Sequence, residues 1–351
     1  MVKLTRILAF VVALVFATSC AGTSEGASST NQPVAIGAGL SGPSGLTATV
    51  YARGLEHASA FAFDAENQLW VATAAYEDEG DDGVYLVSAS GVTPLQVIAG
   101  VHTPLGLLWY GGELYVSSKE RVDAYSGFDG TRFTTSRTVV TFPEGTGEDN
   151  GLAVSSDGRI VLGISAPCDA CTPTSDLSAT IVSFRPDGTD LRVYASGIRA
   201  AVGLVYYPGT DDLFATMNQR DDLAAKAPGD WLGVVSEGDA WGFPDCHGQG
   251  GSACTGVPEP AAVLDRHAAV SGVAIVTGGL GTTVGSSAIV AEWAKGKVER
   301  VVLERDGDTY TGTVEPFLTG FKSPEPVASA PDGSVFVGDW TTGKIYRISA
   351  S

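Results

Sequence analysis

The chain has 351 residues, of which 44% are hydrophobic and 17% are charged, and 45 are glycines. This composition excludes general disorder, and many glycines with few charges favour an all-β chain with tight turns over a helical bundle. The formal net charge is −19, with 21 Lys and Arg residues against 40 Asp and Glu residues. We therefore expect no binding to nucleic acid, because neutralising phosphates requires clustered basic side chains.

Residues 1–19 are typical of a bacterial lipoprotein signal peptide. Lys3 and Arg6 precede an uninterrupted apolar run over residues 7–17. This run is too short to span a bilayer, which needs about 20 residues, but it suits the core of a signal peptide. The small residues directly before Cys20 resemble a lipoprotein cleavage box, which predicts that Cys20 becomes the lipidated first residue. Ordinary signal cleavage with an incidental Cys20 is the alternative.

The next segment, residues 20–45, is rich in Ala, Gly, Ser, Thr and Pro and contains one charge, Glu25. Such a segment cannot bury a core, so we predict a flexible tether to a domain over residues 46–351. Residues 268–291 also lack charge, but their scattered Gly, Ser and Thr indicate two buried strands. We expect an exported protein of the bacterial cell envelope that touches the membrane only through its lipid anchor.

The four remaining cysteines form two local pairs. Export places them in an oxidising compartment, so disulfides Cys168–Cys171 and Cys246–Cys254 are predicted. A four-cysteine zinc site is the less favoured alternative.

An internal repeat predicts the architecture. A glycine followed by alternating apolar residues recurs at intervals of roughly 45 to 70 residues, with alanine or proline in its place at the two ends. The first strands are predicted at residues 60–63, 106–109, 151–154, 203–206, 272–275 and 326–329. Second strands are predicted at 68–71, 113–116, 159–162, 212–215, 288–291 and 334–337, and third strands at 84–87, 121–125, 180–184, 232–235, 298–302 and 344–348.

Six such units predict an all-β, six-bladed β-propeller. No fourth strand follows residue 348, whereas residues 46–52 form a spare strand at the start of the domain. We predict that this N-terminal strand pairs with the last blade and closes the ring, which removes an open edge. A β-sandwich is the alternative, but six regular repeats argue against it.

The loops that enter the first strands share one face of a propeller with the loops that follow the second strands. Five of the six entry loops contain a basic-type residue at a similar position: His57, His102, Arg199, His267 and Lys322. We expect these side chains to surround the channel and to attract an anionic ligand. The alternative for each histidine is a capping or hydrogen-bonding loop residue.

Blade three departs from this pattern, because Glu148, Asp149 and Asn150 occupy the corresponding place. Glu148 and Asp149 are candidates for a catalytic base, a metal ligand or a partner of Arg199. The surrounding cations are expected to lower the pKa of Asp149.

Several motifs recur from Cys168 onward: CDAC, SFRPDGTDLRVYASGIR, GLVYYPGTDDLFAT, NQRDDL and GDAWGFPDCHG. Residues 267–272 and the stretch from FLTGF through APDGSVFVGDWTTGKIYRI continue the series. Together these motifs resemble those of the glucose/sorbosone dehydrogenases, the soluble quinoprotein sugar dehydrogenase family. The resemblance implies a six-bladed propeller that binds pyrroloquinoline quinone (PQQ) at the channel mouth, with calcium beside it, and oxidises a sugar by hydride transfer. It implies cofactor contacts from His57, His102, Asn150, Arg199, His267 and Lys322, and calcium ligands among Asp221, Asp222 and Asp230.

Three positions depart from the family's pattern. The family's catalytic His corresponds to Gly147, an expected Asn after Arg199 is Ala200, and an expected Glu beside Asp230 is Trp231. A sugar hydroxyl must lose its proton as hydride leaves, so Asp149 or Glu148 would have to replace the His as base.

Two functional hypotheses follow from these observations. The first is a quinone-dependent dehydrogenase of a sugar or related polyol or aldehyde. The second is a non-catalytic propeller that binds an anionic sugar, a sugar acid or a protein partner at the cell surface. The sequence leaves the oligomeric state open.

Overall fold

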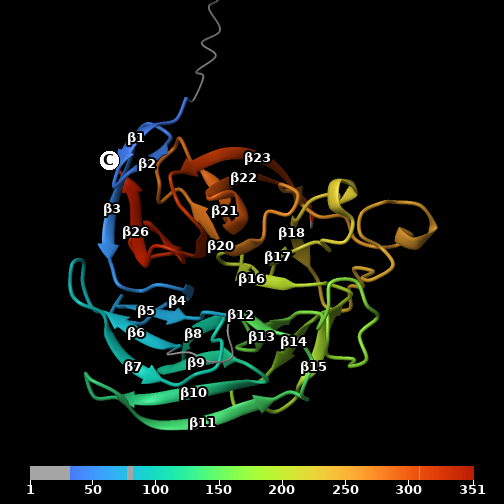
Figure 1. The fold of residues 1–351 in the computed structure, drawn as a ribbon, viewed down its shortest axis with the longest axis horizontal. Coiled ribbons are helices and arrows are strands. Elements are labelled where there is room, and N and C mark those ends of the chain that lie inside the picture. The colour runs from blue at the N-terminus through green and yellow to red at the C-terminus, as the bar shows by residue number, and fades with distance from the viewer. Residues whose placement is uncertain (1–31, 77–81, 308) are drawn as a thin grey trace, which may run out of the picture. The chain divides into compact units, whose positions relative to one another are not determined.

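The computed structural model describes residues 32–76, 82–307 and 309–351, and these residues form β-strands with three short 3-10 helices (Figure 1). The predicted signal peptide, Cys20 and the first part of the predicted tether lie outside the described residues. No helix among the described residues is long and apolar enough to cross a membrane.

Six antiparallel sheets form the blades of a β-propeller, as the repeat predicted. Blades one to three contain β4 (Ala58–Phe63), β5 (Leu69–Thr73), β6 (Gly83–Val87) and β7 (Leu95–Ala99); β8 (Gly106–Tyr110), β9 (Glu113–Ser118), β10 (Arg121–Phe128) and β11 (Phe133–Thr141); and β12 (Asp149–Val154), β13 (Ile160–Ile164), β14 (Thr180–Phe184) and β15 (Arg192–Ser196). Blades four to six contain β16 (Ala201–Tyr206), β17 (Leu213–Met217), β18 (Trp231–Val235) and β19 (Ala262–Val263); β20 (Val270–Thr277), β21 (Ser286–Glu292), β22 (Lys297–Asp306) and β23 (Thr309–Thr319); and β24 (Pro324–Ser329), β25 (Val335–Asp339) and β26 (Lys344–Ala350).

The first strand of each blade contacts the first strands of its two neighbours, in the circular order β4, β8, β12, β16, β20, β24 and back to β4. These six strands therefore surround the central axis. This close contact between strands explains the glycine of the repeat. A Cβ on Gly106 would lie 2.3 Å from the carbonyl oxygen of Asn150 in the next blade. A Cβ on Gly151 would similarly lie 2.5 Å from the carbonyl oxygen of Val202. The strands can approach this closely only without a side chain at these positions.

The ring is closed by β3 (Leu46–Ala52), which pairs antiparallel with β26 as the outer strand of blade six. The pairing places Val50 opposite Tyr346 and Ala48 opposite Ile348. The predicted closure by the N-terminal strand is confirmed, and it joins the two ends of the domain through backbone hydrogen bonds.

Two further strands lie within the range that the sequence predicted to be tether. β1 (Val34–Gly37) pairs with β2 (Leu40–Gly42), and β2 extends blade five through a pairing of Ser41 with Thr319. Ile36 and Leu40 are buried against Phe317 and Leu318. Two apolar side chains therefore suffice to dock this segment, although its overall composition resembles that of a linker.

Both predicted disulfides are present. Cys168–Cys171 lies in the loop between β13 and β14, and Cys246–Cys254 lies in the long loop between β18 and β19. Each bridge constrains a loop on a blade rather than joining two blades.

Candidate functional site

A cavity of 1030 Å³ lies where loops and first strands from all six blades converge. Residues from the start of β12, from the loop after β13 and from the entry to β16 line much of its wall. The face predicted from the repeat is thus the face that carries the cavity.

Of the five basic-type residues that were predicted to surround the channel, only Arg199 lines this cavity, together with the three blade-three residues Glu148, Asp149 and Asn150. His57 instead stacks on Trp340, with ring centroids 4.3 Å apart. His267 Nδ1 lies 2.8 Å from Asp221 Oδ1, and its Nε2 lies 2.9 Å from the carbonyl oxygen of Ala224. For His267 the alternative of a hydrogen-bonding loop residue is correct, although its partners lie in the loop after β17 of blade four, whereas the ring of His57 packs on Trp340 of blade six.

His102 and Lys322 are exposed and do not line the cavity. Their backbones hold the loops instead, because the His102 carbonyl accepts a hydrogen bond from Lys119 N–H and Lys322 N–H donates to Asp339. The sequence predicted correctly that these residues lie in entry loops. The prediction that they point into the channel is wrong, because the turn into each first strand directs residues nearer the strand toward the axis.

The cavity is acidic, which corrects the expected positive ring. Six carboxylates and two cations line its described wall. They are Glu120, Glu144, Glu148, Asp149, Asp169 and Glu325, with Lys119 and Arg199. A wall of this composition attracts cations and repels anions.

Asp149 is buried at the start of β12, with 2% of its surface exposed. Neither carboxylate oxygen has a hydrogen-bond partner of regular geometry among the described residues. Burial raises the pKa of Asp149 to about 8, and the nearby N–H groups of Glu120 and Arg121 oppose this rise only in part. The sequence predicted a lowered pKa, and that prediction is wrong because the expected ring of cations does not surround this group.

Glu325 is a second buried carboxylate in the same cavity, and it was not predicted. Its Oε1 accepts a hydrogen bond of 2.8 Å from the Tyr76 hydroxyl, whereas its Oε2 has no partner among the described residues. Burial raises the pKa of Glu325 to about 8, and the charge of Glu148 adds to the rise. Glu148 itself is exposed to the cavity but largely surrounded by protein, so burial raises its pKa while Arg199 lowers it.

One signal in the sequence could have indicated Glu325. Glu325 lies in the first strand of blade six, directly before the residue that replaces the repeat glycine. The equivalent positions of the other five first strands carry no acidic residue. Tyr76 carried no such signal, because its hydroxyl reaches Glu325 from blade one, 249 positions away in sequence.

Asn150 lines the cavity, but its amide is committed to the protein. Its Nδ2 donates to the Glu148 carbonyl over 3.1 Å and to Ser165 Oγ over 2.9 Å. These bonds hold the chain that presents Glu148 and Asp149.

Gly147, which stands where the resemblance expects a catalytic His, occupies a place that excludes any side chain. Its φ is +133°, and a Cβ there would lie 2.0 Å from the carbonyl oxygen of Ser165. The loss of the His is therefore accompanied by a backbone that only glycine fits.

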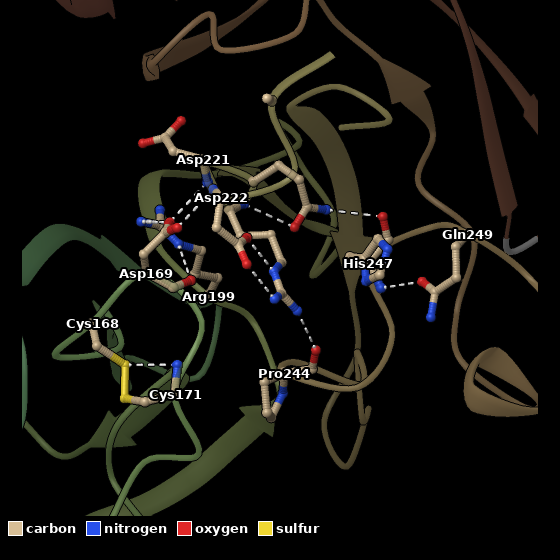
Figure 2. Close-up of polar contacts among 12 residues, drawn as sticks. Cys168, Asp169, Cys171, Arg199, Asp221, Asp222, Pro244, His247 and Gln249 are labelled. Carbon is tan, nitrogen blue, oxygen red and sulfur yellow. Dashed lines mark hydrogen bonds and ion pairs between the residues drawn. A yellow bond between two sulfur atoms is a disulfide. The ribbon is translucent and has the colours of Figure 1, made fainter. Parts of the chain in front are cut away.

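Arg199 reaches the disulfide loop rather than a free ligand site (Figure 2). Its Nη2 donates to Asp169 Oδ1 over 2.9 Å, and its Nε donates to the Asp169 carbonyl over 3.0 Å. The same Asp169 carboxylate accepts hydrogen bonds from the backbone N–H groups of Asp221 and Asp222, at 2.8 and 2.9 Å. Arg199 thus has a structural role at the edge of the cavity.

The three predicted calcium ligands do not come together. Asp221 bonds to His267 through its carboxylate. Asp222 forms a two-point ion pair with Arg220 at 2.7 Å. Asp230 accepts hydrogen bonds from the backbone N–H groups of Gln219, Ala268 and Val270. In the part of the chain that the structure describes, no three His, Cys, Asp or Glu side chains are placed to hold a metal ion.

The fold is similar to that of several soluble sugar dehydrogenases. The PQQ-bound aldose sugar dehydrogenase of Streptomyces coelicolor is 20% identical, with a TM-score of 0.69, over 88% of this chain and 99% of that one. The soluble aldose sugar dehydrogenase of Escherichia coli in its apo form is 17% identical, with a TM-score of 0.67, over 87% and 100%. A calcium structure of the Trichoderma reesei carbohydrate-active enzyme of family AA12 is 17% identical, with a TM-score of 0.73, over 92% and 98%.

Because all three sequence identities are 20% or lower, these similarities support the fold and nothing beyond the fold. No family model and no curated protein sequence matches the chain. The likeness that the motifs predicted is therefore confirmed in architecture.

The residues of this cavity do not fit the groups named for those relatives. PQQ is a tricarboxylate at neutral pH, whereas most charged side chains of the described wall are carboxylates and its Arg199 is already paired with Asp169. Calcium prefers about six to eight oxygen ligands. The described residues bring no three His, Cys, Asp or Glu side chains together that could begin such a site.

Proposed function

We propose that this chain is an exported, lipid-anchored propeller that binds a carbohydrate in the 1030 Å³ cavity at its channel mouth. The sugar dehydrogenase-like fold supports this proposal, because the relatives named above act on sugars at the same architecture. The wall supports it as well, since carboxylates accept hydrogen bonds from hydroxyl groups and the Tyr76 and Trp293 rings offer apolar faces.

The observation that carries the proposal is the buried carboxylate of Asp149 in the cavity wall, whose oxygens have no hydrogen-bond partner of regular geometry among the described residues. A buried acceptor without a donor is costly, and a ligand hydroxyl supplies the missing donor. Burial raises the pKa of Asp149 to about 8, so the carboxyl is mainly protonated at pH 7, and the ionised form that accepts a proton from a hydroxyl becomes the major form only above about pH 8.

Oxidation of the bound sugar is the second candidate function, favoured by this raised pKa. Oxidation requires a hydride acceptor. PQQ fits the described wall poorly, so we assign PQQ no role in the reaction. On this hypothesis Asp149 is the proton acceptor in place of the missing His.

The test titrates the full-length protein with aldoses by calorimetry and then repeats the titration on Asp149→Asn. We expect binding by the wild type and weakening of at least about tenfold in the variant, the range for a lost hydrogen bond to a charged group. Addition of PQQ and calcium, followed by an absorption spectrum and sugar-dependent dye reduction, tests the second function. Absence of any sugar binding contradicts both candidates, whereas dye reduction that Asp149→Asn abolishes establishes oxidation.

A further inference from the structure

Two nearly fully buried carboxylates belong to the cavity wall. Asp149 is 2% exposed, and only the backbone N–H groups of Glu120 and Arg121 lie near its oxygens, without regular hydrogen-bond geometry. Glu325 is 4% exposed, and its Oε2 has no hydrogen-bond partner among the described residues. Both residues line the cavity. In a folded protein such groups are normally paired, because an unpaired buried charge costs far more than an unpaired neutral group.

We infer that the cavity selects a cationic carbohydrate, an amino sugar bound through its ammonium group at Glu325 and Glu148. This inference rests on the proposed function, that the cavity takes a carbohydrate, and names the class of carbohydrate.

Glu325 provides the primary contact. Tyr76 donates a 2.8 Å hydrogen bond to Oε1, which fixes the carboxylate and leaves Oε2 as the free acceptor. Glu148 lies close enough for its charge to act on Glu325 and is itself exposed to the cavity. An ammonium group carries three N–H donors, so a group bound to Glu325 keeps donors for other acceptors of the wall and is attracted by the charge of Glu148.

An aromatic wall stands beside these carboxylates. Tyr76 and Trp293 line the cavity, and the ring of Trp340 lies behind both, with centroid distances of 6.4 and 5.8 Å. The Trp340 indole N–H donates to the Ala74 carbonyl over 2.9 Å, which fixes the wall in place. Aromatic faces pack against the C–H face of a sugar ring and attract a nearby cation.

Other ligand classes fit this wall less well. A sugar acid or a quinone carboxylate would meet mainly negative charge, and the guanidinium of Arg199 is held by Asp169. A neutral sugar donates hydroxyl hydrogen bonds but leaves the excess charge uncompensated. A bare metal ion needs a set of ligands that the described residues do not bring together.

The test is a calorimetric comparison of glucosamine with glucose, N-acetylglucosamine and glucuronate on the full-length protein near neutral pH. We expect glucosamine to bind about tenfold or more tightly than glucose and N-acetylglucosamine, the range for one charge-assisted hydrogen bond, and glucuronate to bind least. Because burial holds the pKa of Glu325 at about 8, with Tyr76 and Glu148 facing it, an arriving ammonium group displaces a proton. The binding enthalpy of glucosamine should therefore depend on the ionisation enthalpy of the buffer, whereas that of glucose should depend on it less.

Two substitutions examine the contact. Glu325→Gln retains an acceptor for the Tyr76 hydroxyl and removes the charge, and Glu148→Gln removes a charge that is exposed to the cavity, where folding depends on it less. Each should reduce the preference for glucosamine over glucose by about fivefold to tenfold. The matched control is Glu304→Gln, an exposed carboxylate on β22 that does not line the cavity. It also removes one negative charge and should leave the preference unchanged.

The outcomes separate the inference from the proposed function. Equal binding of glucosamine and glucose overturns the amino-sugar inference and leaves carbohydrate binding in place. Binding of cyclohexylamine as tightly as glucosamine overturns it also, because the sugar ring then contributes nothing. If none of the sugars binds, the proposed function fails and the inference fails with it.

Discussion

Asp169 accepts a hydrogen bond from Arg199 and is flanked by the two cysteines of the blade-three disulfide. The same carboxylate accepts the backbone N–H groups of Asp221 and Asp222, so one side chain joins blade three to the loop after the second strand of blade four. The disulfide loop forms one edge of the cavity through Cys168 and Asp169. This relationship gives the CDAC motif a structural role that does not require redox chemistry.

Substitution of Asp169 by Ala should therefore destabilise the protein by about 1–3 kcal/mol, because three donors lose a charged acceptor at a partly exposed site. Urea unfolding followed by tryptophan fluorescence measures the change. The control is Asp245→Ala, an exposed aspartate in the disulfide loop of blade four, which should change stability by less than about 0.5 kcal/mol. Equal losses of unfolding free energy in the two variants would contradict a stabilising role of Asp169 between blades three and four.

The lipid anchor is tested at Cys20. Cys20→Ser should release the protein into the medium or leave it with its signal peptide, because the modified thiol is the point of attachment. Fractionation of cells followed by mass spectrometry of the N-terminus measures the outcome. Unchanged membrane association of the variant would refute lipidation and favour plain signal cleavage.

A histidine at position 147 should not restore the base that the resemblance expects. Gly147→His places a Cβ 2.0 Å from the Ser165 carbonyl oxygen and imposes a φ of +133° on a residue with a side chain. We expect a loss of about 3 kcal/mol or more of unfolding free energy, or failure to fold. Gly145→His is the matched control, because Gly145 lies in the same loop with φ of +76° and open space around it. It should cost only about 1–2 kcal/mol, from backbone conformation alone.

The sequence predicted the blades because the repeat has a direct physical cause. The glycine of a repeat, such as Gly106 or Gly151, lies in a first strand that contacts the next blade around the axis. Counting the repeats along the sequence therefore predicts the number and order of the blades. The local cysteine pairs were predictable for a similar reason, since short separations leave few alternatives.

The site was predicted less well, because side-chain direction within a loop depends on contacts between distant residues. His57 turns toward Trp340 in blade six, and His267 turns toward Asp221 in blade four. Neither partner is close in sequence, so a shared repeat position could not reveal them. The contact between Tyr76 and Glu325 was hidden for the same reason.

The acidic cavity should make stability depend on pH. Burial raises the pKa of Asp149 from 3.8 and that of Glu325 from 4.5, each to about 8. Between about pH 4 and pH 8 the folded protein therefore binds more protons than the unfolded chain, so the free energy of unfolding falls as pH rises through this window. The loss is complete above about pH 8, where both states are ionised.

Thermal unfolding at about pH 5, 7 and 9 measures this dependence. We expect the melting temperature of the wild type to fall from pH 5 to pH 9, and Asp149→Asn to lose part of that fall because its amide does not ionise. At pH 9 the variant should be the more stable protein by on the order of 1–4 kcal/mol, since it removes a buried charge that lacks a partner. Asp239→Asn, at a half-exposed carboxylate outside the cavity, should retain the wild-type slope. A wild-type melting temperature that rises over the same range would show that Asp149 and Glu325 are ionised and stabilised by partners in the folded protein, and the argument for a ligand cation would then lose its basis.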